Sequence, residues 1–281
     1  MRERTTDNAT QGGWMEVQTK RGSTLLLCLL LALAACAIAS AGATAALPSY
    51  AECEATEGPF SDPGCHHLGP PDTWAVVPFE FGPETLVKAT FEARVAKAGL
   101  RIEPTTGMAL TCKGASSSGE FAGSKEERAV LYAFRGCRLG SQPCMSAGQQ
   151  AGRITTYPLT AVLGYLAGAG TSMPTVGLSF SAESEPYLLQ ASCGSVNVRL
   201  SGAVVGVVSH DIDFMSKVSI QTFAQTAGVQ EFTSFEGGTP SERQLQLEFS
   251  GGSYGVGTPA LAAGLQLAER VPWPMFMEIE A

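Results

Sequence analysis

Alternation of apolar and polar residues with a period of two is the strongest constraint on the fold of this chain. Val196, Val198 and Leu200 alternate with polar neighbours, and the same period recurs over residues 245–249. This period places every second side chain on one face of an extended chain, so each segment is expected to form a half-buried β-strand. Alternation or short apolar runs predict further strands over residues 74–81, 86–95, 108–112, 129–134, 153–166, 175–180, 187–193, 203–208, 218–222 and 275–279.

Turn-forming residues separate these predicted strands. Gly, Pro and Ser gather at residues 114–119, 168–174, 183–186, 237–238 and 251–252. Glycine and proline favour the backbone angles of tight turns, so these segments are expected to end strands. Short strands with almost no helical period must close their apolar faces on one another, which predicts an all-β fold of the β-sandwich or jelly-roll type. Residues 261–270 alone fit either a helix or a strand.

Residues 1–45 have the three-part composition of an export signal. Arg2, Arg4, Lys20 and Arg21 precede the apolar stretch TLLLCLLLAL, which grades into small residues. This order of charged, apolar and small-residue regions is typical of a secretory signal peptide. We therefore expect an exported protein, extracellular or at the cell surface.

Three fates of this segment remain open. The sequence LAAC resembles a bacterial lipobox and would place a lipid anchor on Cys36. The sequence ATA, ending at Ala45, offers an ordinary cleavage site and plain secretion. Residues 25–47 are also long enough to span a bilayer of about 30 Å, although their second half, rich in Ala and Gly, makes an uncleaved anchor the weakest alternative.

Six cysteines lie beyond the export segment, and an even number in an oxidising compartment predicts three disulfides. They are Cys53, Cys65, Cys112, Cys137, Cys144 and Cys193. Spacing alone cannot choose among the possible pairings. Gly and Pro between Cys53 and Cys65, and between Cys137 and Cys144, favour these two local pairs, which leaves Cys112 with Cys193.

Residues 46–73 are rich in Gly, Pro and Cys and show no periodicity, which predicts an extended leader tied by a disulfide. A single β-sandwich domain is expected over residues 74–281, a length that one all-β domain can fill. Cys65, His66 and His67 also invite a zinc site in the leader. No other Cys or His stands at ligand spacing, so a disulfide with two exposed imidazoles is favoured, and no metal or cofactor is predicted.

His210, Asp211 and Asp213 form the most concentrated polar cluster of the predicted body, directly after an apolar strand. The carboxylates could contribute to calcium binding, or one could orient the imidazole for proton transfer. A solvated turn is the plainer interpretation, because two aspartates are too few for a cation that takes 6–8 ligands. These three residues are nevertheless the best candidate binding site in the sequence.

Other patterns point to enzymes or to glycan binding with less support. Residues 251–255 match the G-x-S-x-G nucleophile elbow, but no histidine follows them as that class requires. Glu183 and Glu185 are spaced for one strand face, whereas glycosidase carboxylates face each other across a cleft. The aromatic residues that would suit a glycan-stacking platform, or simply a core, are Trp74, Trp273, Tyr132, Tyr157, Tyr165, Tyr187 and Tyr254.

Charge limits the classes of partner. The formal net charge of -8 argues against a broad phosphate-binding face, so no nucleic acid partner is expected. We expect a non-enzymatic binding or structural protein of the cell envelope or exterior, with a glycan, a cell-wall polymer or an envelope protein as partner. Membrane contact is expected only through the N-terminal segment or a lipid anchor. The alternative is a secreted polysaccharide-active hydrolase or lyase on a jelly-roll scaffold, because paired carboxylates leave no local signature in sequence.

A series of short landmarks runs in order through residues 108–281. They are FRGC at 134–137 with Cys144, GRITT at 152–156, PL at 158–159, LGY at 163–165, VGL at 176–178, SCG at 192–194, SGAVVG at 201–206, GVQ at 228–230, FEGG at 235–238 and EIE at 278–280. In order and spacing they resemble an uncharacterised family of exported, β-rich proteins of soil actinobacteria. The resemblance implies an exported β-rich protein of unassigned function and supplies no catalytic residues.

Overall fold

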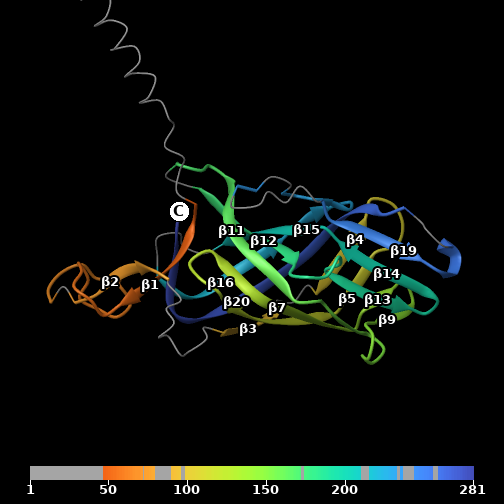
Figure 1. Cartoon of the computed structure of the whole chain (residues 1–281), viewed down its shortest axis with the longest axis horizontal. Coiled ribbons are helices and arrows are strands. Elements are labelled where there is room, and N and C mark those ends of the chain that lie inside the picture. Colours follow the sequence, from red (N-terminus) through yellow and green to blue (C-terminus); the bar gives the residue numbers. More distant parts are fainter. Residues whose placement is uncertain are drawn as a thin grey trace, which may run out of the picture. The chain divides into compact units, whose positions relative to one another are not determined.

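The computed structural model describes residues 47–71, 73–79, 90–95, 99–171, 174–209, 215–232, 235–236, 244–255 and 259–281. These residues belong to one compact unit and are all-β, as the alternation predicted (Figure 1). The elements are β1 (Ser49–Glu54), β2 (Ala75–Pro78), β3 (Thr90–Val95), β4 (Leu100–Pro104), β5 (Leu110–Cys112), β6 (Gly114–Phe121), β7 (Glu126–Arg135), β8 (Arg138–Leu139), β9 (Gln142–Met145), β10 (Arg153–Thr155), β11 (Leu159–Ala167), β12 (Thr175–Ala182), β13 (Leu189–Cys193), β14 (Val196–Ser201), β15 (Ala203–Ser209), β16 (Ser216–Phe223), β17 (Gln225–Thr226), β18 (Val229–Gln230), β19 (Gln246–Ser250), the short 3-10 helix η1 (Gly252–Tyr254) and β20 (Leu261–Glu280).

Eight antiparallel strands close into a barrel, which we call the main barrel. The pairings run through β3, β6, β7, β11, β12, β15, β16 and β20 and return to β3. The expected all-β single domain is confirmed, and its sheet closes on itself instead of splitting into two layers. Closure buries the same alternating faces and also pairs the strands that would otherwise be edges.

A second ring of antiparallel pairings adjoins the main barrel. It runs through β4, β5, β8, β9, β13, β14, β19 and the first part of β20. In Figure 1 these strands lie toward the right of the view, and those of the main barrel lie nearer its centre. The 20-residue strand β20 belongs to both rings, because its first residues pair with β19 and β4 and its later ones with β16 and β3.

One continuous hydrophobic core fills both rings. Phe180 and Phe223 meet edge to face in the main barrel with ring centroids 5.5 Å apart, while Ile102 and Phe249 are fully buried in the second ring. Each such side chain contributes about 1.5–3 kcal/mol by leaving water. The ambiguous segment 261–270 is a strand because its alternate residues face this core.

Residues 114–119, which the sequence marks as a turn, instead form most of β6. The prediction failed because Gly and Ser dominate this strand, although Ala115 and Ser117 point inward and are buried. A β-strand needs only alternating burial, and small inward side chains leave space for bulkier groups on facing strands. Ser117 makes such a contact, described below.

The predicted leader contributes to the same unit as the predicted body. Its strand β1 pairs with β2 and with the end of β20, and Tyr50 on β1 is 1% exposed. Residue 74 is therefore no domain boundary. The stretch that follows β1 is irregular, as expected, and Cys65 ties it back to Cys53.

Three disulfides join all six predicted cysteines, but only one predicted pair is correct. Cys53–Cys65 is confirmed, whereas the other bonds are Cys112–Cys137 and Cys144–Cys193. The Cys137–Cys144 and Cys112–Cys193 predictions were wrong because strand pairing, not the nearest turn, decides proximity. Cys144 on β9 lies directly opposite Cys193 on β13, with the two Cα atoms 4.1 Å apart.

Disulfides are typical of proteins that fold in an oxidising compartment, so the three bonds are consistent with export. The part of the chain described by the structure contains no helix of the length and hydrophobicity needed to cross a bilayer.

Candidate functional site

The best candidate site in the sequence, His210 with Asp211 and Asp213, lies outside the described residues, as does Cys36. Their roles stay predictions. The remaining candidates are the polar groups of the described residues.

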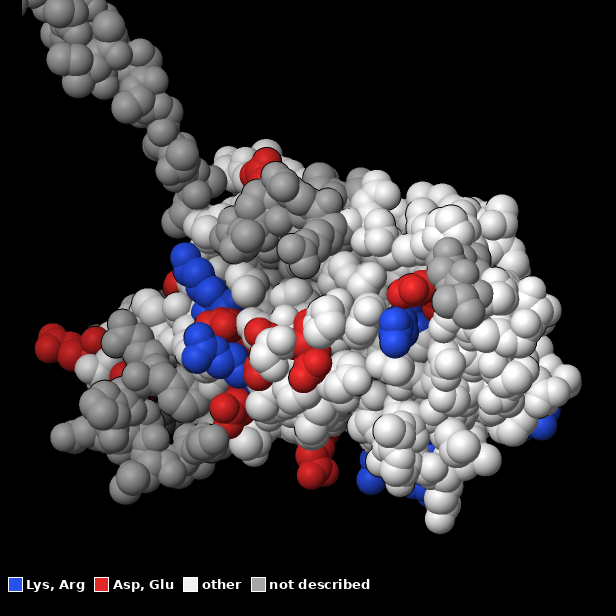
Figure 2. All heavy atoms as spheres, turned by 45° about the vertical axis from the view of Figure 1, so that its right-hand side comes forward, with Lys and Arg blue, Asp and Glu red and all other residues white. Residues whose placement is uncertain are grey.

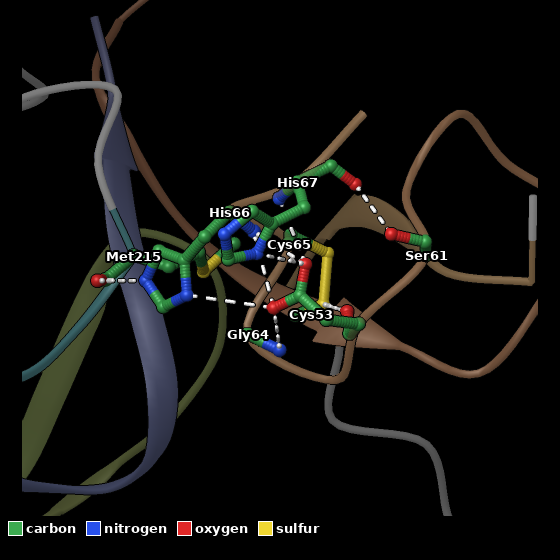
Figure 3. A network of polar contacts seen from close by, with 8 residues as sticks. Cys53, Ser61, Gly64, Cys65, His66, His67 and Met215 are labelled. Carbon is green, nitrogen blue, oxygen red and sulfur yellow. Dashed lines mark hydrogen bonds and ion pairs between the residues drawn. A yellow bond between two sulfur atoms is a disulfide. The ribbon is translucent and has the colours of Figure 1, made fainter. Parts of the chain in front are cut away.

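A polar network organises the loop after β1 (Figure 3). The Asp62 carboxylate accepts hydrogen bonds from the backbone N–H groups of Gly64, His66 and His67 at 3.1, 3.1 and 2.8 Å. Partial burial raises the pKa of Asp62, but these donors outweigh it and hold that pKa below its usual value. The Cys53–Cys65 disulfide crosses the same loop, so the network holds the loop in one conformation.

The two leader histidines do not form a zinc site in this arrangement. Cys65 is bonded to Cys53, which removes the thiolate that a metal would need. Nε2 of His66 lies 3.1 Å from the carbonyl oxygen of Met215. The His66 ring also packs edge to face against the Phe276 ring, with the two ring centroids 5.6 Å apart. His66 thus docks the loop onto the barrel. Within the described ranges, no group of three His, Cys, Asp or Glu side chains could hold a metal ion.

The Gly-rich segment 251–255 forms a turn that contains η1 and follows β19, as its plainer interpretation predicts. Tyr254 stacks on Phe249 with ring centroids 4.8 Å apart, so the turn is packed against the core. The two histidines in the described ranges, His66 and His67, belong to the loop between β1 and β2. Figure 1 shows β1 and β2 at the opposite side of the view from β19, the strand that leads into this turn. No imidazole in the described ranges therefore serves as a base for Ser253.

Glu183 and Glu185 lie in the bend after β12 and not on a strand face. The Glu183 carboxylate accepts a hydrogen bond of 2.6 Å from the backbone N–H of Ala129, whose φ of 49° marks an irregularity in β7. Glu183 thus supports the barrel wall.

The aromatic residues proposed for a glycan platform divide between the interior and the surface. Trp273, Tyr132 and Tyr165 are buried, and Trp74, Tyr157, Tyr187 and Tyr254 are half-buried. Core packing explains the three buried rings, because they present no flat surface to a sugar.

A cluster of hydrogen-bonded carboxyls and hydroxyls lies inside the main barrel. Glu269 on β20 accepts hydrogen bonds from the hydroxyls of Tyr132 on β7 and Ser117 on β6, the latter at 2.7 Å. Glu127 on β7 accepts one from the Tyr50 hydroxyl on β1, also at 2.7 Å. Both glutamates are 1% exposed, and Glu127 Oε2 has no hydrogen-bond partner among the described residues.

Burial sets the protonation of this cluster. It raises the pKa of Glu127 to about 7, while the Tyr50 hydrogen bond opposes the rise and the negative charge of Glu269 adds to it. Burial likewise raises the pKa of Glu269, against the hydrogen bonds from Tyr132 and Ser117. A carboxyl with a pKa near 7 is suited to general acid catalysis, but a catalytic acid must also reach its substrate.

The described residues leave the carboxyls of the cluster almost no contact with solvent, since Glu127 and Glu269 are each 1% exposed. A void beside Tyr132 measures only about 30 Å³ and is walled by apolar side chains such as Phe180 and Leu267. That space suits a water molecule or two and no larger ligand. The paired carboxyls therefore act within the barrel, where they join β1, β6, β7 and β20.

An open hollow, which we call the neutral hollow, lies where segments at β9, β10 and β13 meet. It is lined by residues 145–149, which include the last residue of β9, by residues 155–157 at the end of β10 and by residues 190–192 of β13. Its volume of about 420 Å³ lies within the range of small-ligand sites, roughly 300–1,000 Å³. No Asp, Glu, Lys, Arg or His lines it.

The walls of the neutral hollow are fixed to one another. Met145 lies opposite Ser192 in the β9–β13 register, directly beside the Cys144–Cys193 disulfide. The Ser146 hydroxyl donates to the Gln190 carbonyl oxygen at 2.9 Å and accepts from the Thr155 backbone N–H at 3.2 Å. Covalent and hydrogen bonds thus hold all three segments together before any ligand arrives.

Sequence reasoning missed both sites for different reasons. Glu269 shares its strand face with Leu265 and Leu267, so the alternation contained a signal for an inward-facing carboxyl. The neutral hollow left no such signal, because its three segments meet only in the folded chain.

Comparison with family models, curated proteins and solved structures gives no match for this chain. Function is therefore inferred from geometry and chemistry.

Proposed function

We propose that this chain is an exported, non-enzymatic protein of the cell envelope or exterior, which presents a rigid, disulfide-bonded β-barrel surface to a binding partner. A glycan, a wall polymer or another envelope protein would be that partner. The N-terminal signal composition and the three disulfides support export.

One observation carries the choice of binding over catalysis. The carboxyls that influence one another's ionisation, Glu127 and Glu269, are sealed within a filled barrel. Two hollows among the described residues, one lined by residues 145–149, 155–157 and 190–192 and the other between β15, β18 and β20, have no acidic side chain in their linings. A polysaccharide hydrolase needs two carboxyls facing each other across an accessible cleft.

The surface chemistry also fits a neutral or weakly charged partner. In Figure 2, most of the Asp and Glu side chains lie toward the left and centre of the view, Lys and Arg side chains appear on both sides, and much of the right-hand surface is uncharged. This uncharged area offers no partner to the ionic groups of a highly charged polymer.

The test is a pull-down of the purified protein on glycans and cell-wall polymers, run beside an assay for reducing-sugar release from the same polymers. We expect retention without sugar release. Sugar release that survives Asp211→Asn and Asp213→Asn but disappears when another carboxyl pair is neutralised would establish the hydrolase alternative.

Export has its own test, which is N-terminal sequencing of the native protein. A mature chain that begins at Cys36 with a lipid attached would identify a lipoprotein, and one that begins near Ala46 a secreted protein. An intact Met1 in the cytosolic fraction would contradict both.

A further inference from the structure

The neutral hollow carries a more specific inference, which rests on the proposed binding function. We infer that it binds a segment of a neutral, hydroxyl-rich glycan. Its chemistry, shape and rigidity each bear on the ligand class.

The lining presents neutral hydrogen-bonding groups. Gln149 and Gln190 contribute amides, each of which both donates and accepts, and Tyr157 contributes a hydroxyl. The Ser192 hydroxyl donates to Asn197 Oδ1 at 2.8 Å, so it offers its oxygen to a ligand as an acceptor. Neutral amides and hydroxyls match sugar hydroxyls, which also both donate and accept. A phosphate, sulfate or carboxylate on the ligand would find no cation in the lining and would lose its hydration without compensation.

Apolar contacts are available beside these groups. Met145 is 42% exposed, and the half-buried ring of Tyr157 belongs to the same lining. A sugar ring carries C–H groups on its faces and hydroxyls on its rim, so it makes use of both kinds of contact. A thioether adapts to such an irregular surface because its side chain is unbranched and flexible.

A protein partner suits this hollow less well. Stable protein interfaces bury about 800 Å² on each side and are enriched in exposed aromatic and arginine anchors. The hollow has no arginine, and its one aromatic ring is half-buried. A narrow ligand that fits between fixed walls agrees better with the geometry.

Pre-organisation supports binding of such a flexible ligand. The Cys144–Cys193 disulfide and the Ser146 hydrogen bonds fix the walls, so binding does not have to order them. Binding therefore costs little backbone entropy in the walls, and the main entropic cost lies in ordering the glycan and the long side chains that contact it.

The test uses affinity electrophoresis of the purified protein in gels that contain xylan, mixed-linkage β-glucan, dextran or acidic polygalacturonate. Ala147 is exposed and belongs to the lining, so the large side chain of Ala147→Trp is chosen to occupy the hollow and exclude a ligand. Ala167→Trp is the matched control, because Ala167 is also exposed but ends β11 outside the lining. Gln190→Ala removes one amide, and Gln246→Ala on β19 is its control.

We expect at least one neutral polysaccharide to retard the wild type and Ala167→Trp, and Ala147→Trp to abolish the retardation. Gln190→Ala is expected to weaken it about three- to tenfold, the loss typical of one hydrogen bond. Equal retardation of Ala147→Trp and the wild type would overturn the assignment to this hollow and leave the binding function standing. Retardation by polygalacturonate alone, or by none of the four polymers, would overturn the ligand class, while the cell-wall pull-down decides the proposed function separately.

Discussion

Stability of the main barrel should fall as pH rises through the neutral range, because a carboxyl is buried within it. The Glu127 pKa is about 7 in the folded protein and near its ordinary value of 4.5 in the unfolded chain. Below pH 4.5 both states are protonated and the group costs nothing. Between the two pKa values the unfolded chain releases its proton first, so the free energy of unfolding decreases with rising pH.

The structure also sets the size of this effect. The interval between 4.5 and about 7 corresponds to roughly 3 kcal/mol, at about 1.4 kcal/mol per pH unit. The free energy of unfolding should therefore fall by about 2 to 3 kcal/mol between pH 5 and pH 8. Glu269, whose pKa burial also raises, contributes in the same direction, whereas Tyr50 and Tyr132 stay neutral because their pKa values are raised well above 10.

Glu127→Gln removes the titration and keeps an oxygen that accepts the Tyr50 hydrogen bond. Its amide N–H₂ occupies the place of the unpartnered Oε2, which we expect to cost about 1–3 kcal/mol at every pH. Because only the wild type titrates, the stability of Glu127→Gln relative to the wild type should improve by about 2 to 3 kcal/mol between pH 5 and pH 8. Urea unfolding with the disulfides intact, followed by tryptophan fluorescence, measures this change in the difference.

Glu126→Gln is the matched control. Glu126 precedes Glu127 on β7 but is partly exposed and pairs with Arg128 at 3.0 Å, so its replacement should change stability by less than about 1 kcal/mol. If the wild type and Glu127→Gln instead lose stability in parallel from pH 5 to pH 8, the buried carboxyl does not titrate as reasoned and the argument fails.

Two further predictions concern the covalent bonds and the core. Non-reducing peptide mapping should recover Cys112 joined to Cys137 and Cys144 joined to Cys193, and free thiols at these positions would contradict both the fold and the oxidising compartment. Phe180→Ala should destabilise the protein by about 3–5 kcal/mol in urea unfolding, because the ring is 1% exposed and packs against two other aromatic rings; a loss below 1 kcal/mol would show that the barrel interior is loosely packed.

The sequence predicts strands where apolar and polar residues alternate strictly. It does not predict contacts whose two partners come from distant segments of the chain. The alternation of Val196, Val198 and Leu200 corresponds to β14, one of the strands with the expected boundaries. In β6 the same period is not visible in the sequence, because one of its inward-facing residues is the polar Ser117. Its hydroxyl donates a hydrogen bond to Glu269, on a strand more than a hundred residues away. Closure into a barrel is likewise a property of non-local pairings.

The disulfide error has the same origin. Gly140 adopts a φ of 60° between β8 and β9, so the turn between Cys137 and Cys144 was correctly placed. Short loops bring chain ends together, but neighbouring strands β5 and β13 bring other sulfur atoms closer. A pattern that covers a few residues cannot show which strand lies beside it.

The sharing of β20 between the two rings determines when the protein can fold. During synthesis β20 (Leu261–Glu280) is the last of the described strands to emerge, yet both rings require it for closure. Until then, the strands that pair with β20 keep unpaired backbone groups on the side that it will fill, namely β1, β3, β4, β16 and β19. Neither ring can therefore close before β20 is available, and the closure of both depends on this one strand.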